Sequence, residues 1–289
     1  MPRGLDHIVH AVHDLDAAVE LYRGLGFTVG ARNRHPREWG TQNHIIQLPD
    51  TFIELLAVTA PEGIAPHRPR HFSFGAFNRD FLERGQGLSM LVLKGGGVKD
   101  AEDFRRSGVG DFELYDFERE GKRPDGATVK VAFSLAFARD AGAPDAGFFT
   151  CQQHYPENFW NPAFQKHANG ATGVAGVVAV ANEPSRHRDF LERFAGAPSA
   201  ACDDGFVIVT PRGAIEMIEP AGFLRRYGVI GPEVSRGARL AALRFAAKGA
   251  SLPEGAPKIA GLAGLDAGNA VVIRADDAMG AVLVFEPPR

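Results

Sequence analysis

The chain has 289 residues, 45% of them hydrophobic, with two cysteines and a net charge of −3 at pH 7, which predicts two domains or a tandem repeat. This charge excludes the strong basic field that binding to nucleic acid or an anionic membrane requires, so we expect a small-molecule partner. Few cysteines, no signal-peptide pattern and no apolar run of about 18 residues indicate a cytoplasmic protein without a disulfide framework or membrane span.

The chain begins with a strand followed by a helix. Residues 6–12 (DHIVHAV) have the alternation of a half-buried strand, and Asp14 is a suitable N-cap for a helix that Gly24 and Gly26 end. Turn and loop signals then predict three more strands, at 27–29, 41–48 and 51–58, with a polar loop at 30–40. His7 lies at the start of the first strand, on the face away from the helix. We expect it to point into whatever the sheet encloses.

This β-α-β-β-β order returns along the chain. After a connector with helical spacing at 74–84, a second unit is predicted with strands at 88–95, 112–120, 129–138 and 147–154 and a helix at 99–106. A third unit has strands at 173–181, 205–210 and 214–219 and a helix at 185–194. The fourth is weaker, with a Gly/Pro/Ala-rich stretch in place of its helix and strands at 239–246, 270–274 and 280–286. Four copies in two pairs indicate an internal repeat.

Two segments of the first unit carry a family resemblance. The run DHIVHAVHDLDAAVELYRGLGF, followed by a strand that contains FIELL, resembles the vicinal oxygen chelate superfamily, and Gly40-Thr41-x-Asn43 ahead of FIELL resembles its glyoxalase-like subgroup. The resemblance implies an α+β fold of tandem β-α-β-β-β units, paired into two cup-shaped domains with mixed sheets. We expect the first domain at 1–168, with units at about 5–58 and 87–155, and a second, degenerate domain at 169–289.

The resemblance also implies a metal site, because the ligands in that superfamily come from the first and last strands of the units. Carried onto this chain, the pattern gives His7, Glu54 and His154, and Ser89 or Met90 stands where a fourth ligand is expected. Two imidazoles and one carboxylate suit Fe²⁺ and also Zn²⁺, Mn²⁺ or Ni²⁺. Open coordination positions would let a substrate bind through two adjacent oxygens.

Two of these expected ligands, His7 and Glu54, also have a purely structural interpretation. Glu54 lies in an otherwise apolar strand, where a buried carboxylate is costly unless it is paired or bound to metal, but an edge strand could turn it to water. A strand histidine such as His7 is more often a hydrogen-bonded or rim residue. The basic loop at 32–37, which includes His35, is interpreted as a solvated loop, with attraction of an anionic substrate as the alternative.

Further candidates surround the metal set. Proton transfer needs an additional group, for which we consider Gln152 and Glu157. Five residues of the subgroup segment and of the polar, aromatic stretch after the last strand are predicted to contact substrate: Trp39, Asn43, His44, Tyr155 and Trp160. Hydrogen bonding at the strand entry is an alternative role for Asn43, and a hydrophobic plug over the cup is an alternative for the two aromatic residues after the strand.

The second half does not repeat the metal pattern. Gly176 stands where the first unit has His7, and the isolated carboxylates of Glu216 and Glu286 do not make a transition-metal site. We therefore expect residues 169–289 to support the first domain, cover its cup or mediate dimerisation. Whether the units pair within one chain or across a homodimer stays open.

The function expected from these features is a divalent-metal-dependent, glyoxalase-like enzyme acting on a small oxygenated molecule. Isomerase or lyase chemistry and Fe²⁺-dependent ring-cleaving dioxygenase chemistry are not separated by the sequence. The alternative is a metal-free protein of the same fold that binds a small molecule, as resistance proteins do.

Overall fold

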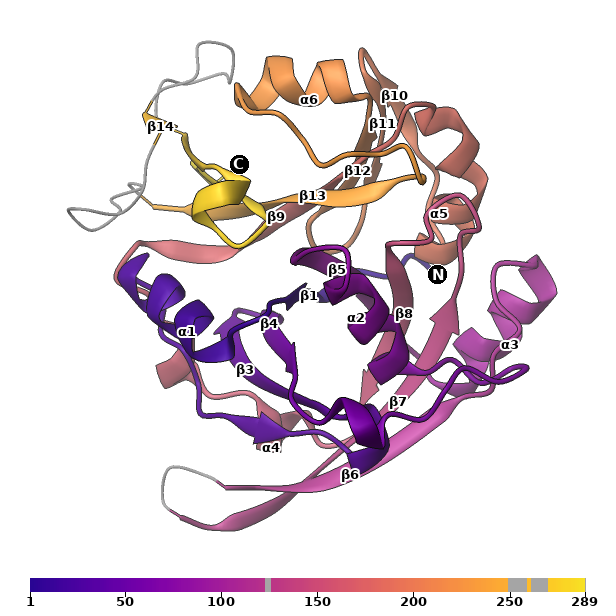
Figure 1. The fold of residues 1–289 in the computed structure, drawn as a ribbon, viewed down its shortest axis with the longest axis vertical. Helices are drawn as coiled ribbons and strands as arrows, with labels where there is room; N and C mark the ends of the chain where they lie inside the picture. Colours follow the sequence, from indigo (N-terminus) through magenta and orange to yellow (C-terminus); the bar gives the residue numbers. More distant parts are fainter. Residues whose placement is uncertain (123–125, 249–258, 261–269, 289) are drawn as a thin grey trace.

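The described residues form two curled, mixed sheets of eight strands each (Figure 1). The structure is a computed structural model and describes residues 1–122, 126–248, 259–260 and 270–288. The first sheet uses residues 5–153 and the second uses residues 171–286. The predicted α+β fold of tandem β-α-β-β-β units in two cups is confirmed.

The first sheet holds both units of the first half. Its strands are β1 (Leu5–Ala11), β2 (Asn33–Arg34), β3 (Thr41–Leu48), β4 (Thr51–Val58), β5 (Gly87–Lys94), β6 (Tyr115–Lys122), β7 (Thr128–Ala138) and β8 (Gly147–Gln153). They lie in the order β2-β3-β4-β1-β5-β8-β7-β6. Strand β1 is parallel to β4 and β5 is parallel to β8, whereas β1 and β5 are antiparallel neighbours. The first strands of the two units therefore meet at the centre of the sheet.

The second sheet repeats this plan. Its strands are β9 (Ala171–Val180), β10 (Ala200–Cys202), β11 (Gly205–Val209), β12 (Ala214–Ile218), β13 (Arg239–Ala247), β14 (Ile259–Ala260), β15 (Val271–Ile273) and β16 (Val282–Glu286). Their order is β10-β11-β12-β9-β13-β16-β15-β14, with β9 and β13 as the central antiparallel pair. Most of the Gly/Pro/Ala-rich stretch in the fourth unit lies outside the described residues.

One predicted strand was wrong. Residues 27–29 form no strand, because the backbone N–H of Phe27 donates to Tyr22 O at 3.0 Å and that of Thr28 donates to His167 Nδ1 at 3.1 Å. The second strand of the unit is instead the short β2, inside the segment predicted as a loop. The chain thus crosses from the helix to β3 along the mouth of the cup, which brings the loop residues near its interior.

The segments between the strands form α-helices and short 3₁₀ turns. The α-helices are α1 (Leu15–Gly24), α2 (Phe74–Leu82), α3 (Val98–Ser107), α4 (Pro156–Phe159), α5 (Arg188–Ala195) and α6 (Pro220–Tyr227). Short 3₁₀ turns occur at η1 (Arg37–Trp39), η2 (Pro61–Gly63), η3 (Pro162–Gln165), η4 (Pro184–His187) and η5 (Ala275–Asp277). As expected, Asp14 caps α1, accepting from the N–H groups of Asp16 and Ala17 at 2.9 and 3.0 Å.

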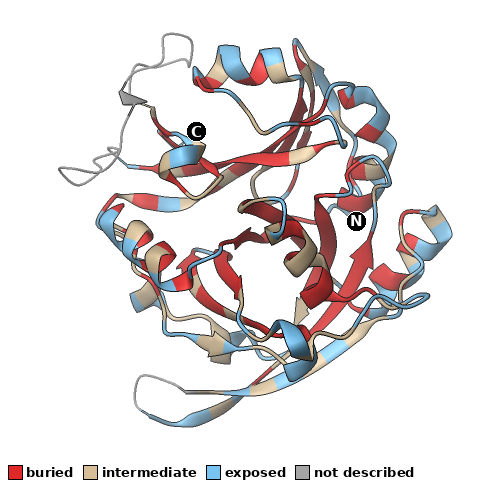
Figure 2. Cartoon of the chain, in the orientation of Figure 1, coloured by how far each residue is buried: buried red, intermediate tan, exposed pale blue. Residues whose placement is uncertain are grey.

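Three apolar cores result. Helices α1, α3 and α5 pack with the outer faces of both sheets into one core that joins the two halves. Helix α2 packs inside the first cup and α6 inside the second, each with its own core (Figure 2). The connector between the two units of each half is therefore a helix that packs against the inner face of its own sheet.

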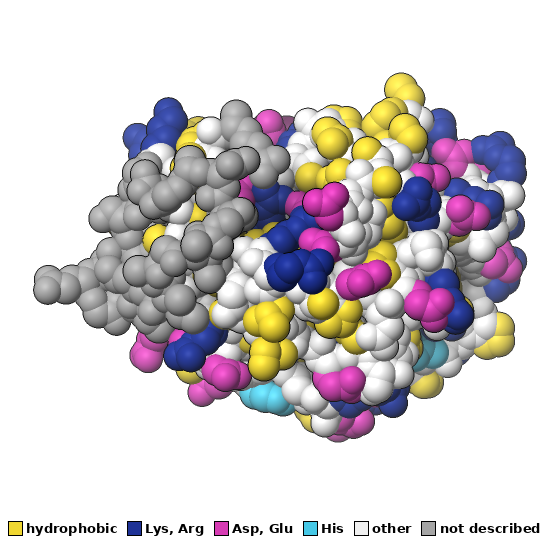
Figure 3. Space-filling view, turned by 90° about the horizontal axis from the view of Figure 1, so that it is seen from above, with side chains coloured by type: hydrophobic (Ala, Val, Ile, Leu, Met, Phe, Trp, Pro, Cys, Tyr) yellow, Lys and Arg dark blue, Asp and Glu magenta, His cyan; other side chains and the backbone are white. Residues whose placement is uncertain are grey.

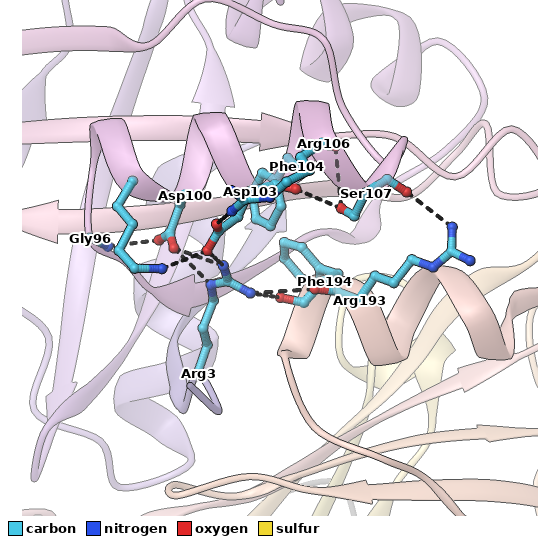
Figure 4. A network of polar contacts seen from close by, with 10 residues as sticks. Arg3, Gly96, Asp100, Asp103, Phe104, Arg106, Ser107, Arg193 and Phe194 are labelled. Atoms are coloured by element: carbon cyan, nitrogen blue, oxygen red, sulfur yellow. Dashed lines mark hydrogen bonds and ion pairs between the residues drawn. The ribbon is translucent and has the colours of Figure 1, made fainter.

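Arg3 ties the two halves together at one edge of the shared core (Figure 4). Its guanidinium donates to Asp100 Oδ1 at 2.8 and 3.0 Å on α3, and to the Phe194 carbonyl at 2.9 Å on α5. Arg193 reaches back from α5 to the Ser107 carbonyl at 3.0 Å. Both the apolar core and this polar cluster hold the sheets in one arrangement.

The surface carries charges of both signs in small groups. The face over the second sheet shows basic and acidic side chains interspersed with apolar ones, without a large area of one sign (Figure 3). None of the helices in the described part of the chain has the length and apolar character needed to cross a membrane.

Candidate functional site

A pocket that opens to solvent lies inside the first cup, and the space between its atoms, open solvent included, is about 490 Å³. Its walls are mainly aromatic, and its polar lining consists of a few side chains from β1, β3, β4, β6 and the loop after β2. The lining residues are His7, His35, Trp39, Asn43, Ile45, Phe52, Glu54, Phe74, Phe117, Arg119, Phe133, Leu135, Phe149, Cys151 and Phe159. A small polar group inside an apolar pocket is the usual design of a small-molecule site.

Strand register places His7 and Glu54 on the same wall of this cavity. In the parallel pair β1 and β4, Val9 is opposite Glu54 and His7 is opposite Phe52, and side chains two residues apart share a face. His7 Nε2 lies 3.8 Å from Glu54 Oε2, and the His7 ring stacks on Phe52 with centroids 4.2 Å apart. Both polar side chains are only about 5% exposed.

Asp6 fixes the orientation of the His7 ring. Its Oδ1 lies 2.6 Å from His7 Nδ1, and Asp6 is itself buried. A carboxylate accepts hydrogen bonds, so Nδ1 carries the proton and the Nε2 lone pair faces the cavity. This is the arrangement found where a histidine binds a metal through Nε2 and a carboxylate holds its other nitrogen.

His35 completes the polar group, although sequence reasoning assigned it only to a basic loop. Its Nε2 lies 3.3 Å from Glu54 Oε1, and its Nδ1 lies 2.8 Å from Thr41 Oγ1. Burial lowers the pKa of His35, so the ring is neutral near pH 7. A neutral imidazole is the form that binds metals.

Asn43 connects His35 to Glu54. Its amide Nδ2 donates to Glu54 Oε1 at 2.6 Å and lies 3.0 Å from His35 Nε2. That contact makes His35 Nε2 an acceptor and leaves the proton on Nδ1, where Thr41 accepts it. The Gly-Thr-x-Asn segment thus positions two other side chains of the site.

Three acceptor groups of the site lie next to one another, and Asn43 and Arg119 supply donors beside them. The Nε2 atoms of His7 and His35 and the carboxylate of Glu54 converge, and Glu54 Oε2 accepts no hydrogen bond from the described residues. Two imidazole nitrogens and a carboxylate are donor types that suit a divalent transition-metal ion. In this structure the Asn43 amide lies between His35 Nε2 and Glu54 Oε1.

The structure does not bring His154 to this group. Phe149 and Cys151 of β8 face the cavity, so Gln152 and His154, which alternate with them, lie on the other face of the sheet. His154 is exposed, follows the end of β8, and has its Nε2 2.7 Å from Ser134 Oγ. A difference of one residue in strand register moves a whole set of side chains across a sheet.

The remaining candidates for a ligand or base are also elsewhere. Ser89 donates to Asn78 Oδ1 at 2.9 Å, and Met90 packs in the apolar core of the cup. Gln152 lines a separate cavity next to Asp6. Glu157 is exposed on α4 and is not among the described residues that line the pocket of His7 and Glu54.

Some of the predicted substrate-contacting residues line the cavity and others do not. Trp39 and Asn43 line the cavity. His44 is buried and its Nδ1 lies 2.7 Å from the Gly30 carbonyl. Tyr155 is exposed beside Lys130, and Trp160 packs against Phe159 at the edge of the cup rather than in the cavity.

The thiol of Cys151 lines the cavity too. Burial raises its pKa well above the usual value, and the negative charges of Asp6 and Glu54 act in the same direction. The thiol therefore stays protonated near pH 7 and is a poor nucleophile.

The second cup holds a different polar group at its centre. Arg244 of β13 donates to Glu286 through Nε at 3.1 Å and Nη2 at 2.6 Å, and its Nη1 contacts Glu216. Arg226 of α6 donates to the other oxygen of Glu216 at 2.6 Å. The two carboxylates that the sequence left isolated are thus neutralised by arginines.

Comparisons with known proteins agree with this fold. The family model of the glyoxalase-like domain matches residues 5–194. A hypothetical protein from Staphylococcus aureus is 13% identical, with 99% of this chain and all of that protein covered and a TM-score of 0.66. A variant of 4-hydroxymandelate synthase from Streptomyces coelicolor is also 13% identical, with 84% of this chain and 71% of that protein covered and a TM-score of 0.50.

None of the curated protein sequences matches this chain significantly. The solved structures share its fold at low identity, and the family model covers well over half of its residues. The chain belongs to the glyoxalase-like domain family.

Proposed function

We propose that the chain is a divalent-metal-dependent, glyoxalase-like enzyme that acts on a small oxygenated molecule bound in the first cup. The convergence of His7, His35 and Glu54 on one aromatic cavity carries this proposal. His35 takes the place that the sequence assigned to His154. Fe²⁺ and Zn²⁺ fit this donor set best, and Mn²⁺ and Ni²⁺ are also compatible with it.

Each part of the site has a separate task in this function. His7 would hold the ion through Nε2 and Glu54 through its carboxylate. His35 Nε2 would join them in place of its contact with the Asn43 amide, while Asp6 and Thr41 hold the Nδ1 atoms of the two rings. When bound, the ion supplies Lewis acidity toward a substrate with two adjacent oxygens. The aromatic walls exclude water and pack against the carbon skeleton of the substrate.

The chemistry within this class is isomerase or lyase chemistry, or oxygen-dependent ring cleavage with Fe²⁺. A second candidate function is metal-free binding of a small molecule. The aromatic lining favours it, because seven phenylalanine and tryptophan side chains would bind an apolar ligand without any ion, namely Trp39, Phe52, Phe74, Phe117, Phe133, Phe149 and Phe159.

Metal binding distinguishes these functions. Protein purified anaerobically without chelator is expected to contain near-stoichiometric metal, whose identity then selects the assays. His7→Ala, His35→Ala and Glu54→Gln should each lower metal affinity by at least about tenfold, since each removes one donor. His154→Ala is the matched control and should retain the metal of the parent.

Retention of metal by His35→Ala together with its loss from His154→Ala would overturn the ligand set. A parent protein that stays metal-free and cannot be loaded with Fe²⁺, Zn²⁺, Mn²⁺ or Ni²⁺ would overturn the enzyme proposal and leave small-molecule binding as the function. Circular dichroism of each variant verifies that the fold is intact.

A further inference from the structure

Arg119 enters the cavity from the edge strand β6. Side chains along this strand alternate, so Phe117 and Arg119 line the cavity while Glu118 is exposed, with its carboxylate 2.6 Å from Lys130 Nζ on β7. Arg119 is therefore the one cationic side chain among the described residues that line the aromatic pocket.

The guanidinium of Arg119 has no carboxylate partner within ion-pair distance among the described residues. Among the described residues it makes one long hydrogen bond, from Nη1 to the Glu120 carbonyl at 3.4 Å. Burial lowers the pKa of Arg119, and the negative charge of Glu54 opposes that effect. An arginine remains charged even so, and a half-buried charge without a partner is costly unless an anion binds to it.

Arg119 also lies where two cavities meet. Arg119, Ile45 and Phe159 line both the inner cavity and an outer one with about 860 Å³ of empty volume. The outer cavity has polar groups on its walls, among them Asn33 and Gln47. A bound ligand whose reacting end lies next to Glu54 would thus extend past Arg119 toward solvent.

We propose that Arg119 binds a carboxylate of the substrate, so that the substrate class is a small apolar or aromatic carboxylic acid. The planar guanidinium matches a carboxylate with two parallel hydrogen bonds, and the phenylalanine walls accommodate the rest of the molecule. This inference rests on the proposed function for the identity of the reacting end. The contact with Arg119 itself requires no metal.

A matched pair of probes tests this contact in chelator-treated protein. Phenylacetate and phenylacetamide have the same shape and differ in charge, and NMR titration gives both dissociation constants. The parent should bind the carboxylate at least about tenfold more tightly than the amide. Arg119→Gln should abolish this preference, and Arg119→Lys should retain part of it because a single point charge replaces the guanidinium.

Lys130→Gln is the control, since it removes a cation on the outer side of the same hairpin, and it should keep the preference of the parent. Equal binding of the two probes by the parent, or an unchanged preference in Arg119→Gln, overturns the proposal. Because the titrations use chelator-treated protein, a failure of metal loading is distinguishable from a failure of Arg119.

Discussion

The orientation of the His7 side chain depends on its sequence neighbour Asp6 as well as on strand β1. Asp6 is adjacent to it, and the carboxylate reaches the ring because the start of β1 is irregular, with a shift in the register to β5 between Leu5 and His7. The pair makes Asp6 a positioning residue for the proposed metal ligand, although it does not line the cavity itself.

Asp6→Asn tests this role. The amide can turn its NH₂ group toward Nδ1 and favour the wrong tautomer of His7, so metal affinity should fall by about 10- to 100-fold. Competition with a chelator of known affinity measures the change. Asp50→Asn, at a nearby exposed turn, is the control, and an equal affinity loss in both variants would contradict a specific effect on His7.

The reactivity of the two cysteines should differ. The buried Cys151 has a raised pKa, whereas Cys202 is partly exposed and accepts a hydrogen bond from Arg226 at 3.3 Å. A thiol reagent at pH 8 should modify Cys202 at least about tenfold faster than Cys151, because only the thiolate reacts. Mass spectrometry of the modified peptides, with Cys202→Ser as control, measures both rates. Faster modification of Cys151 would show that its thiol is not buried in solution.

At the residue scale, the sequence predicts a site residue where a local pattern specifies its position. His7 and Glu54 were recoverable because strand alternation and the family pattern specify their face. His35 was not, because its position depends on a turn at Pro36 and Gly40, where Gly40 has a φ of 62°, and on contacts with β3. The many basic residues around His35 indicated a solvent-exposed loop, and no periodic pattern in the sequence contradicted that interpretation.

Helix α2 shapes the cavity by its close approach to the segment at Trp39. Gly75 lies so near the Trp39 carbonyl that a Cβ there would collide with it, and Trp39 stacks on Phe74 with ring centroids 4.4 Å apart. The helix and the loop therefore fix one wall of the site together.

Gly75→Ala should lower the free energy of unfolding by about 1–3 kcal/mol, since the helix has to move away from the Trp39 carbonyl. Gly24→Ala is the contrasting variant, because Gly24 is the last residue of α1 and nothing lies within 4 Å of its added Cβ. It should raise stability by about 0.5–1 kcal/mol. Urea denaturation measures the free energy of unfolding of both variants. Equal changes in Gly75→Ala and Gly24→Ala would contradict the close approach of α2 to the Trp39 carbonyl.

At the scale of elements, two errors have clear physical causes. The family pattern assigned His154 to the inner face of the last strand, but Phe149 and Cys151 of β8 pack inside the cup, which turns Gln152 and His154 to the other face. Helix α6 was overlooked although Pro220 at its start and Gly228 at its end are typical boundary residues. Its eight residues were too few for a convincing period in the sequence. The boundary between the halves at residue 168 stays a prediction.

Across the whole molecule, His10 connects the first sheet with the second. Its Nε2 lies 2.9 Å from the Met279 carbonyl and its Nδ1 lies 2.9 Å from the Tyr22 hydroxyl, inside the shared core. Burial lowers the pKa of His10 to about 4, against the opposing effect of the bond to Met279. The folded protein therefore holds His10 neutral where the unfolded chain would bind a proton.

The sign of the pH effect follows from this difference. Stability from neutral His10 is fully present above pH 6.5 and is lost as the pH falls toward 4, by up to about 3 kcal/mol. His10→Gln should be less stable at pH 7 but should lose less stability between pH 7 and pH 4.5. Urea denaturation at both pH values tests this, and parallel losses in parent and variant would exclude His10 as the cause.

The guanidinium of Arg244 gives the second cup a cation that is covalently part of the chain. Such a charge cannot dissociate, be exchanged for a different ion or be removed by a chelator. The duplicated architecture therefore separates two ways of neutralising buried carboxylates: a permanent one in the second cup, and in the first a group of acceptors open to a mobile ion. If the first cup binds metal as proposed, the second half would keep its charge balance whatever the metal supply and would hold the shared core in place while the first cup gains or loses its ion.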